Sequence, residues 1–540
     1  MQEVRVFAGE QPAIAARLLE TPHATKAINC RLDNGNLRGI PSPVEVSPQP
    51  NLVSSADTLY LYANTHWFSF ANYRHVVKTP IREDQYDRVY FAGGGVRPQY
   101  TRNDVATGGT NPLPAQVFTL GVPAPDEAPR LAYPNKDEVD NDPLDNETRF
   151  YVTTYVTAIG EESAPSPVSD KLVILDPSRD NVDVQLPTMV SNTYQITHVN
   201  VYRSATGGED AAFFLVGTVS YGETDFTDTP DIVLGPTLAT EGFAMPPEDL
   251  HAMTKISGGM MVGAVGKTVC ISEAYLPYAW KKSNQLVASD DVVAIAPLPS
   301  GAVVATTGYP ELLSGYAPES MSLDRLELAQ ACVSARSMVD MGTRAIYASP
   351  DGLVSASVQG AQLMTQDIMH PEQWQALNPS SIHAYHHEGE YIGFYKVSAN
   401  EKGGFIFNPS RRDISFIDMY ATTGYRDLNS DNLYLVVGNT LFIYRDHATQ
   451  KEEYTWRSKV FDTAHSHYAM YRIKHKAGSD PSGTTVTIYT EDGNIHSSEL
   501  TDGEWGYIPP GLYQQWQIEV KGDQEIEAIL LGNSLAELGV

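Results

Sequence analysis

The sequence predicts an all-β protein, built as a β-propeller with an inserted β-sandwich and a second β-sandwich at its C-terminal end. Turn-forming and strand-forming residues are abundant, with 41 Gly, 35 Pro and 30 Tyr among 540 residues. Short runs of alternating β-branched and aromatic residues recur between clusters of Gly, Pro, Asp and Ser, and few stretches have a helical period. A chain of this length has room for about three or four domains.

Two segments, residues 44–122 and 242–450, have the pattern of propeller blades. The first contains the runs TLYLYA, THWFSF, HVVKTPI and DRVYFAG, and the second repeats strand pairs joined by Asp-Gly, Ser-Gly and Gly-Asn turns. Paired strands at a spacing of about eight to twelve residues are typical of blades. Residues 322–338 are the exception, because their pattern is more helical, and we expect them to cross between blades.

Residues 123–241 form the predicted insertion. FYVTTYVTAIGEESAPSPVS (150–169), VNVYRSATGG (199–208) and FFLVGTVSYGETDFTDTPD (213–231) alternate strand and turn, which predicts a small antiparallel sandwich. The stretch resembles fibronectin-type-III-like modules of phage tail proteins. Its "YVT…GEES" piece precedes the "VYR" piece, so either the module is permuted or its strands pair differently. An acidic loop at 134–147 lacks the Gly and the closing Glu of an EF-hand.

Both ends of the chain also have β patterns. Residues 451–540 alternate through EYTWRSKVFDT, YAMYRIKHKA and TTVTIYTEDGNIHSSEL, with a turn at Asp492-Gly493, and predict the terminal β-sandwich. Residues 1–43 are expected to form an N-terminal arm and a first strand, with a hairpin turn at Asn34-Gly35. The pattern leaves open whether this arm braces a neighbouring molecule or belongs to the blades.

The charge and cysteine content exclude some classes of protein. With 37 basic and 66 acidic residues the net charge is −29, which argues against sequence-specific nucleic-acid binding. Such acidity either aids solubility or forms a wall along which DNA slides without sticking. Cys30, Cys270 and Cys332 have no C-x-x-C spacing, which predicts buried thiols and assembly in a reducing cytoplasm. No apolar run predicts a membrane span, and the N-terminal residues lack the pattern of a secretory signal.

The motifs that could support chemistry are incomplete. The run 263–268 ends like a phosphate loop, but Met261 stands where a Gly is needed, so a hairpin turn is predicted. Gly93-Gly94-Gly95 is expected to be a turn or bulge with positive φ. His383, His386 and His387 form the densest histidine cluster, and zinc is conceivable there, but no fourth ligand has a telling spacing. No G-x-S-x-G elbow and no distinguished carboxylate pair occurs. We therefore expect no catalytic, cofactor-binding or metal residues, no cofactor, and no enzyme activity.

Several segments together resemble one family of phage virion proteins, the tail nozzle or "tail tubular protein B" type of short-tailed phages. The resemblance covers most of the chain, in AINCRLDNGNLR, GEES, ISEAYLPYAW, ASPDGLVSAS, EQWQALNP, TWRSKVF and the closing LAEL. It implies a tail structural protein of the virion that forms a homo-oligomeric ring, commonly a hexamer, through which genomic DNA passes without sequence-specific binding. It also implies contacts with adaptor and fibre proteins of the tail.

Two other classes of function stay open from the sequence. An adhesin or fibre-attachment protein would bind a host receptor or glycan through exposed loops of the sandwich. A propeller glycosidase would need one carboxylate pair at the spacing of an acid and a nucleophile or base. The first would be detected by adsorption to host cells, and the second by release of reducing sugar.

Overall fold

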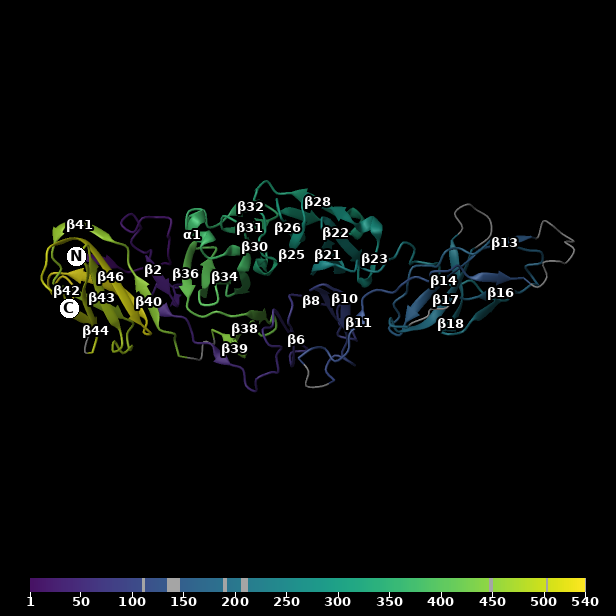
Figure 1. Ribbon diagram of the computed structural model, residues 1–540, viewed down its shortest axis with the longest axis horizontal. Helices are drawn as coiled ribbons and strands as arrows, with labels where there is room; N and C mark the ends of the chain where they lie inside the picture. Colours follow the sequence, from purple (N-terminus) through teal and green to yellow (C-terminus); the bar gives the residue numbers. More distant parts are fainter. Residues whose placement is uncertain are drawn as a thin grey trace.

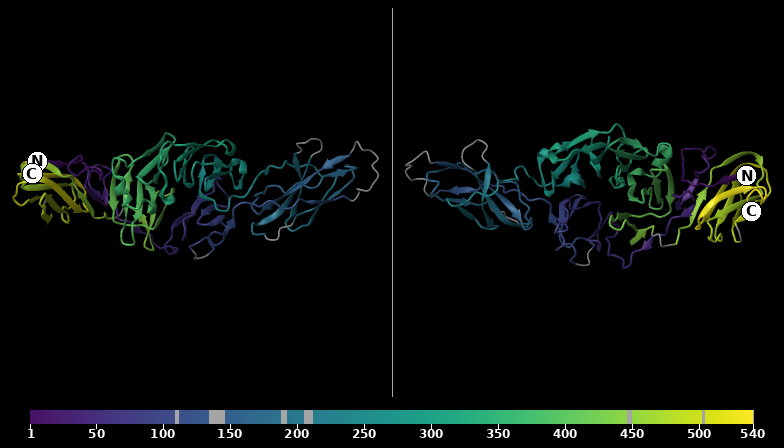
Figure 2. Two further views of the ribbon diagram at one scale, coloured as in Figure 1. Left: turned by 45° about the horizontal axis from the view of Figure 1, so that its top comes forward. Right: turned by 180° about the vertical axis from the view of Figure 1, so that it is seen from behind.

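The computed structural model describes residues 1–108, 112–133, 146–187, 192–204, 212–445, 450–501 and 504–539. Three parts lie in a row along the longest axis of the molecule (Figure 1), the C-terminal sandwich at one end, the propeller in the middle and the insertion at the other end. Both chain termini lie in the C-terminal sandwich, and Figure 2 shows the same order from two further directions. The all-β class predicted from the sequence is confirmed, because strands make up nearly all of the regular structure.

Seven sheets surround the propeller axis in the part of the chain that the structure describes. Their innermost strands are β6, β8, β20, β25, β29, β33 and β37, and neighbouring inner strands are in contact from β8 round to β37, which in turn contacts β6. Between β6 and β8, the Arg74 N–H donates a 2.8 Å hydrogen bond to Thr58 Oγ1 and completes the circle. Because each inner strand begins a new antiparallel sheet, the blades stand radially around a common axis.

Blades 1 to 5 follow one another in chain order. Blade 1 consists of β6 (Thr58–Tyr62) and β7 (His66–Phe70). Blade 2 consists of β8 (His75–Lys78), β9 (Val89–Gly93), β10 (Val96–Thr101) and β11 (Phe118–Thr119). Blade 3 consists of β20 (His251–Ile256), β21 (Met260–Val265), β22 (Thr268–Glu273), β23 (Leu276–Trp280) and β24 (Leu286–Val287). Blades 4 and 5 consist of β25 (Val292–Leu298), β26 (Gly301–Thr306), β27 (Glu311–Ser314) and β28 (Ser322–Arg325); and β29 (Val339–Asp340), β30 (Ala345–Ala348), β31 (Leu353–Ser357) and β32 (Gly360–Leu363).

Blades 6 and 7 recruit strands from the N-terminal arm. Blade 6 consists of β33 (His383–His387), β34 (Glu390–Lys396), β35 (Lys402–Asn408) and β36 (Asp413–Ile417). Blade 7 consists of β37 (Thr423–Arg426), β38 (Leu433–Val437), β39 (Thr440–Tyr444) and β5 (Val44–Glu45). Strand β5 pairs with the outer strand of blade 7, and β2 (Lys26–Ile28) pairs in parallel with the outer strand of blade 6. The short helices between strands are η1 (Ser257–Gly259), η2 (Lys282–Asn284), η3 (Pro318–Ser320), η4 (Ala335–Ser337), α1 (Pro371–Gln375) and η5 (Pro379–Ser381).

The insertion lies between blades 2 and 3 and contains three antiparallel sheets. They are formed by β12 (Arg130–Ala132), β16 (Val182–Gln185) and β19 (Asp225–Asp228); by β13 (Glu147–Arg149) and β15 (Leu172–Ile174); and by β14 (Tyr151–Thr157), β17 (Ile196–Ser204) and β18 (Phe213–Ser220). The "YVT" strand β14 pairs directly with the "VYR" strand β17. The likeness to fibronectin type III stays a prediction. Residues 134–145 of the acidic loop, which include the Asp140-Asn141-Asp142 run compared with an EF-hand, lie outside the described residues.

The C-terminal sandwich is completed by the start of the chain. Its sheets contain β1 (Gln2–Val4), β47 (Ile526–Gly532), β42 (Met470–His475) and β45 (Trp505–Tyr507), facing β40 (Tyr454–Arg457), β46 (Tyr513–Gly522), β43 (Thr485–Thr490), β44 (Gly493–Glu499) and β41 (Phe461–Ser466). A small hairpin of β3 (Cys30–Arg31) and β4 (Arg38–Gly39) turns at Gly35, whose φ is +84°. Val4 and Phe7 lie in the same apolar core as Trp456 and Trp516. The arm therefore belongs to this sandwich as well as to the blade edges.

The turns predicted from glycine are confirmed, whereas segment 322–338 is helical only at η4 (Ala335–Ser337), where the chain crosses from blade 4 to blade 5 as expected. Gly93, Gly94 and Gly95 have φ of +89°, +71° and +71° between β9 and β10, and Gly266 turns the hairpin of β21 and β22 with φ of +54°. Residues 322–325 form the outer strand β28, because Leu323 pairs with Leu313 of β27. This pairing within blade 4 overrides the local helical pattern. The three cysteines are free and buried, as expected. No helix of the described residues is both long and apolar enough to cross a membrane.

A buried acid joins the arm to the propeller and gives a pH-dependent prediction. Glu10 accepts a 2.6 Å hydrogen bond from the Ala27 N–H, and its own N–H donates to the Ile414 carbonyl of β36. Burial raises the pKa of the Glu10 carboxyl to about 7 from 4.5, although the Ala27 hydrogen bond and the charge of Lys26 act in the opposite direction. The folded protein therefore holds a proton that the unfolded chain releases, and the free energy of unfolding falls as the pH rises between these values.

Replacing Glu10 with glutamine is expected to stabilise the protein at pH above about 7, by roughly 3 kcal/mol at most, since one pKa unit corresponds to about 1.4 kcal/mol. Near pH 4 the gain should vanish, because the carboxyl is then protonated in both states. Urea unfolding across this pH range measures the effect. The exposed Glu20→Gln change is the control, and a pH-independent gain in Glu10→Gln would contradict the prediction.

Candidate functional site

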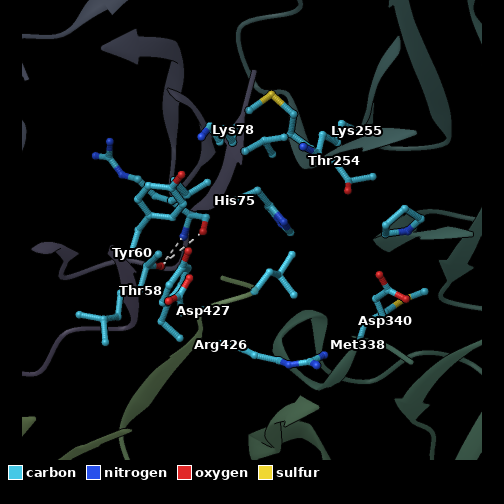
Figure 3. Close-up of a pocket in the computed structure, with 18 of the residues that line it drawn as sticks. Thr58, Tyr60, His75, Lys78, Thr254, Lys255, Met338, Asp340, Arg426 and Asp427 are labelled. Carbon is cyan, nitrogen blue, oxygen red and sulfur yellow. Dashed lines mark hydrogen bonds between the residues drawn. The ribbon is translucent and has the colours of Figure 1, made fainter. Parts of the chain in front are cut away.

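A cavity with a volume of about 1000 Å³ lies on the propeller axis. We call this space the axial cavity. Residues from the inner strands and from the loops beside them line it, and Figure 3 shows side chains of several blades converging on the same space. The volume falls in the range of small-molecule sites. The sequence did not mark this site, because its residues come from segments about 370 positions apart, between Asp57 and Asn429.

The charge of the axial cavity is the reverse of the charge of the chain. Six basic side chains line it, Arg74, Lys78, Arg82, Lys255, Arg336 and Arg426. Three acidic side chains line it, Asp57, Asp340 and Asp427. The whole sequence has 37 basic and 66 acidic residues, so basic groups are the minority of its charges but the majority in the cavity. A cavity with this excess attracts anions.

Four of these cations have a carboxylate within 4.0 Å, Lys78 and Arg82 through the exposed Asp87 and Glu83, and Arg336 and Arg426 through closer contacts. Arg336 Nη1 lies 3.0 Å from Asp57 Oδ1, and Arg336 Nη2 donates to the Thr422 carbonyl. Arg426 Nη2 lies 2.7 Å from Asp431 Oδ1. These contacts fix the two guanidinium groups in place and neutralise part of their charge.

Arg74 and Lys255 have no carboxylate within ion-pair distance among the described residues. The buried Nε of Arg74 has no acceptor there either, and its guanidinium lies 4.8 Å over the Phe70 ring. Partial burial and the like charge of Lys78 both lower the pKa of Lys255. Lys78 itself has one partner, Asp87, at 3.7 Å. In Figure 3 Lys78 and Lys255 lie near each other on the same side of the cavity.

Tyrosine rings accompany the cations. Tyr60, Tyr73, Tyr275, Tyr385 and Tyr425 line the axial cavity. Tyr275 is the most exposed, with 55% of its surface accessible, and it stands at the turn between β22 and β23 with a φ of +60°. A positive φ at a non-glycine residue is strained and is often found at functional positions.

Gly259 holds Tyr275 in this position. The Tyr275 N–H donates a 2.8 Å hydrogen bond to the Gly259 carbonyl, and a Cβ on Gly259 would lie 2.4 Å from the Tyr275 ring. Gly259 also has a φ of +75°. Only glycine accepts both the dihedral angle and the approach of the ring.

Replacing Gly259 with alanine is therefore expected to lower the free energy of unfolding by about 1 to 2 kcal/mol for the dihedral angle, and further for the clash with the ring. Gly95→Ala is a matched control, because Gly95 has a φ of +71° and a Cβ added there would meet no atom within 4 Å. Thermal or urea unfolding compares the two. Equal losses in both variants would show that the ring does not press on Gly259.

The histidine cluster identified in the sequence does not assemble a metal site. His383 is buried against Phe394, and its Nε2 lies 3.0 Å from the Ala421 carbonyl, while His386 Nδ1 lies 2.8 Å from Arg426 Nη1. His387 is buried against Tyr444. Burial lowers the pKa of His383 to about 3 and of His387 to about 4. Within the described ranges no three His, Cys, Asp or Glu side chains are grouped to hold a metal ion.

The carboxylates of the axial cavity are engaged in local contacts. Asp340 accepts the Gly342 N–H, and Asp427 accepts the N–H groups of Asn429 and Ser430. Hydrogen bonds from Ser430 and from these backbone groups hold the pKa of Asp427 low against its burial, which is opposite to the change a general acid needs. Glu161, whose pKa burial raises to about 7, pairs with Arg88 at the root of the insertion.

Comparison with known proteins supports no conclusion beyond what the strand pairing shows. No protein-family model and no curated protein matches the sequence. The WD40 domain of Neurospora crassa Pan2 is similar at 9% identity, over 51% of this chain and 88% of that chain, with a TM-score of 0.27. The extracellular domain of the putative hybrid two component system BT3049 from B. thetaiotaomicron is similar at 10% identity, over 97% of this chain and 78% of that chain, with a TM-score of 0.28. PorZ of Porphyromonas gingivalis is similar at 10% identity, over 90% of this chain and 77% of that chain, with a TM-score of 0.25. Scores this low carry no inference about function.

Proposed function

We propose that this protein is a structural subunit of a phage tail, of the nozzle or tail-tube type. In this proposal subunits form a homo-oligomeric ring, commonly of six, whose channel conducts DNA and whose outer wall anchors adaptor and fibre proteins. The resemblance of segments spread over most of the sequence motivates it. The protein then acts in the virion after synthesis in the host cytoplasm.

The observation that carries the proposal is a continuous sheet between two parts of the molecule. Strand β2 pairs with β36 of blade 6 on one side and with β40 of the C-terminal sandwich on the other. The order β33-β34-β35-β36-β2-β40-β46-β43-β44 runs without interruption. Backbone hydrogen bonds therefore couple the propeller to the sandwich, whereas domains of one chain joined only by a flexible linker move relative to each other. Such rigid coupling suits a subunit of a wall.

The charge is consistent with a passage for DNA. A net charge of −29 repels phosphate groups and prevents a translocating duplex from adhering. Heterologous contacts between rigid subunits close into a ring when the rotation between them fits. The carboxylates of the axial cavity, which have local partners, favour a structural role over the glycosidase alternative.

Immunogold labelling of intact virions with antibody against this chain tests the proposal. Gold at the far end of the tail is expected. Labelling of slender projections would favour the adhesin instead. Absence of the chain from purified particles, with the protein found only in lysate, would overturn the structural role. The mass of the native assembly gives the number of subunits, each of 59.2 kDa.

A further inference from the structure

We propose that the axial cavity binds an acidic oligosaccharide, with carboxylates facing Arg74, Lys78 and Lys255 and sugar rings packed against the tyrosines. This binding goes beyond the tail role and does not depend on it. A conduit subunit needs no ligand inside its propeller, and a binding protein of another kind could use the same cavity.

The reversal of charge points to an anionic ligand. Cations outnumber carboxylates six to three in the axial cavity of a chain in which acidic residues prevail. Four of these cations have carboxylate partners, Lys78 and Arg82 only exposed ones, whereas Arg74 and Lys255 have none among the described residues. A partly buried guanidinium with an unpartnered Nε costs free energy. A bound carboxylate would pair with the terminal guanidinium nitrogens of Arg74 and reduce the repulsion between Lys78 and Lys255.

The combination of cations with aromatic rings points to a sugar. Tyrosine offers an apolar face and a polar tip, which matches the apolar C–H face and the hydroxyl edge of a sugar. Tyr275 is 55% exposed and is held by Gly259 in a strained turn. The hydrogen bond to Gly259 and the close approach of the ring to it fix Tyr275 where a ligand in the cavity can pack against the ring.

The size of the cavity and the charge of the chain restrict the kind of anion. A volume of about 1000 Å³ fits a short oligomer and is too small for a duplex that passes through it. Single-stranded nucleic acid also combines cations with stacking rings. However, it carries a phosphate at every nucleotide, and the net charge of −29 repels such a ligand outside the cavity. A saccharide with carboxylates only at intervals is repelled less.

Titration calorimetry at low ionic strength on the full chain tests the proposal. The probe is hyaluronan hexasaccharide, which has one carboxylate per disaccharide, and its methyl ester is the uncharged counterpart. We expect the acid to bind, and the ester to bind at least about tenfold more weakly. This factor corresponds to the loss of one charge-assisted hydrogen bond. Lys255→Gln and Arg74→Gln should each weaken binding of the acid by about tenfold.

Two further variants separate the contributions. Lys171→Gln removes the same charge from an exposed site in the insertion and should leave the affinity unchanged. Tyr275→Ala should weaken the acid and the ester by the same factor, because it removes ring contact and no charge. Thermal unfolding of each variant confirms that it is folded.

Three results would overturn the proposal. The first is the absence of detectable binding at a hexasaccharide concentration of about 1 mM, because a dissociation constant above that value is weaker than that of most specific ligands. The second is equal binding of acid and ester, or equal weakening by Lys171→Gln and Lys255→Gln. The third is tighter binding of hexathymidylate that Lys255→Gln abolishes, which would assign the cavity to single-stranded nucleic acid. None of these results bears on immunogold labelling, so the tail role fails or stands separately.

Discussion

Replacing Asp228 with alanine is expected to destabilise the insertion by about 3 to 5 kcal/mol, the cost of breaking a buried ion pair. The Asp228 side chain is fully buried and accepts a 2.6 Å hydrogen bond from Tyr151 Oη. Its Oδ2 also lies 2.7 Å from Arg203 Nη1 and 3.4 Å from Arg149 Nη1. Without the carboxylate, the nearly buried Arg203 would lose its ion pair, and Arg149 would keep only Glu147 at 2.8 Å.

Urea unfolding and limited proteolysis of the full chain measure this loss. We expect cleavage within residues 146–228 to accelerate most. Asp225→Ala is the control, because Asp225 is exposed on the same strand and should change stability by less than about 0.5 kcal/mol. Similar behaviour of the two variants would show that the buried cluster contributes little.

The effect should extend into the propeller. Tyr151 and Val201 of the insertion belong to one apolar core with Tyr90 of blade 2 and Trp280 of blade 3. Residues that share a core unfold together more often than residues separated by a flexible linker. Asp228→Ala should therefore also lower the midpoint of the main unfolding transition.

Local features of the fold could be predicted from the sequence, because strands and turns are specified by neighbouring residues. The strands β6 and β9, with their β-branched and aromatic residues, the positive φ of Gly93 to Gly95, and the turn at Gly266 follow from local chemistry. The burial of His383 and His387 in β33 did not follow from local chemistry, because it depends on packing against Phe394 and Tyr444.

Pairings over long distances along the chain could not be predicted. Ile28 pairs with Phe416, and Val44 pairs with Ile443, yet nothing in the short arm segments specifies those partners. The axial cavity has the same origin, since Arg74, Lys255 and Arg426 meet only when the ring closes. Each is an ordinary surface residue in its own segment. Their joint charge exists only in the folded propeller.

Replacing Arg445 with leucine is the second change for which we expect a loss of about 3 to 5 kcal/mol. Arg445 follows β39, and only 2% of its side chain is exposed. Its Nη1 lies 2.7 Å from Glu390 Oε2 and 3.1 Å from Glu388 Oε2. Leucine would leave two carboxylates of blade 6 without their shared cation, and the side chain of Glu390 is only 10% exposed to water.

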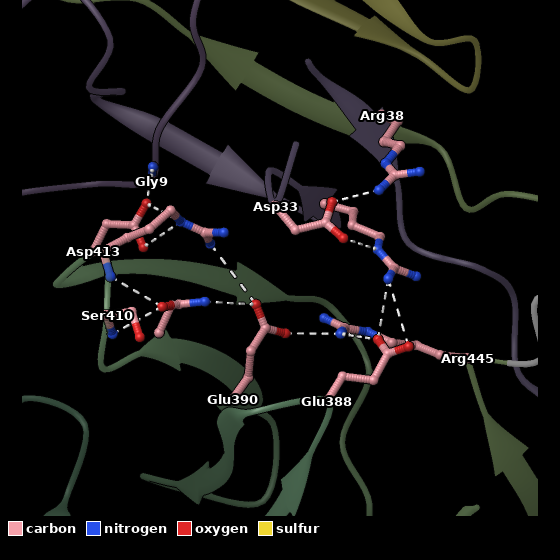
Figure 4. A network of polar contacts seen from close by, with 11 residues as sticks. Gly9, Asp33, Arg38, Glu388, Glu390, Ser410, Asp413 and Arg445 are labelled. Atoms are coloured by element: carbon pink, nitrogen blue, oxygen red, sulfur yellow. Dashed lines mark hydrogen bonds and ion pairs between the residues drawn. The ribbon is translucent and has the colours of Figure 1, made fainter. Parts of the chain in front are cut away.

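The polar network around Arg445 connects the arm to the propeller (Figure 4). Arg31 of the arm lies 3.3 Å from Glu388 Oε2, and Arg411 Nη2 lies 3.7 Å from Glu390 Oε1. Arg411 also contacts Asp413, whose Oδ2 accepts the Gly9 N–H at 2.7 Å. Loss of Arg445 should therefore loosen the arm as well as blade 6, and proteolysis should cleave residues 1–43 faster.

Arg412→Leu is a control matched in backbone and chemistry. Arg412 and Arg445 have φ of +56° and +54°, so strain from the dihedral angle cancels between the two variants. The Arg412 side chain is 50% exposed, and its partner Asp367 is 77% exposed, so its loss should cost less than about 1 kcal/mol. Urea midpoints of the two variants give the difference.

A second substitution distinguishes the loss of the Arg445–Glu390 ion pair from the cost of burying the Glu390 carboxylate without Arg445. In Arg445→Leu, Glu390 keeps only Arg411 at 3.7 Å. If the cost arises from this poorly paired carboxylate, adding Glu390→Gln should recover part of it, because a neutral amide is cheaper to bury than a carboxylate. In the wild-type background Glu390→Gln should be destabilising, since it leaves Arg445 with Glu388 alone. Additive losses in the double variant would contradict a direct coupling of Arg445 and Glu390. The arm would then be held by β2 and β5 pairing, and the ion network would be incidental to it.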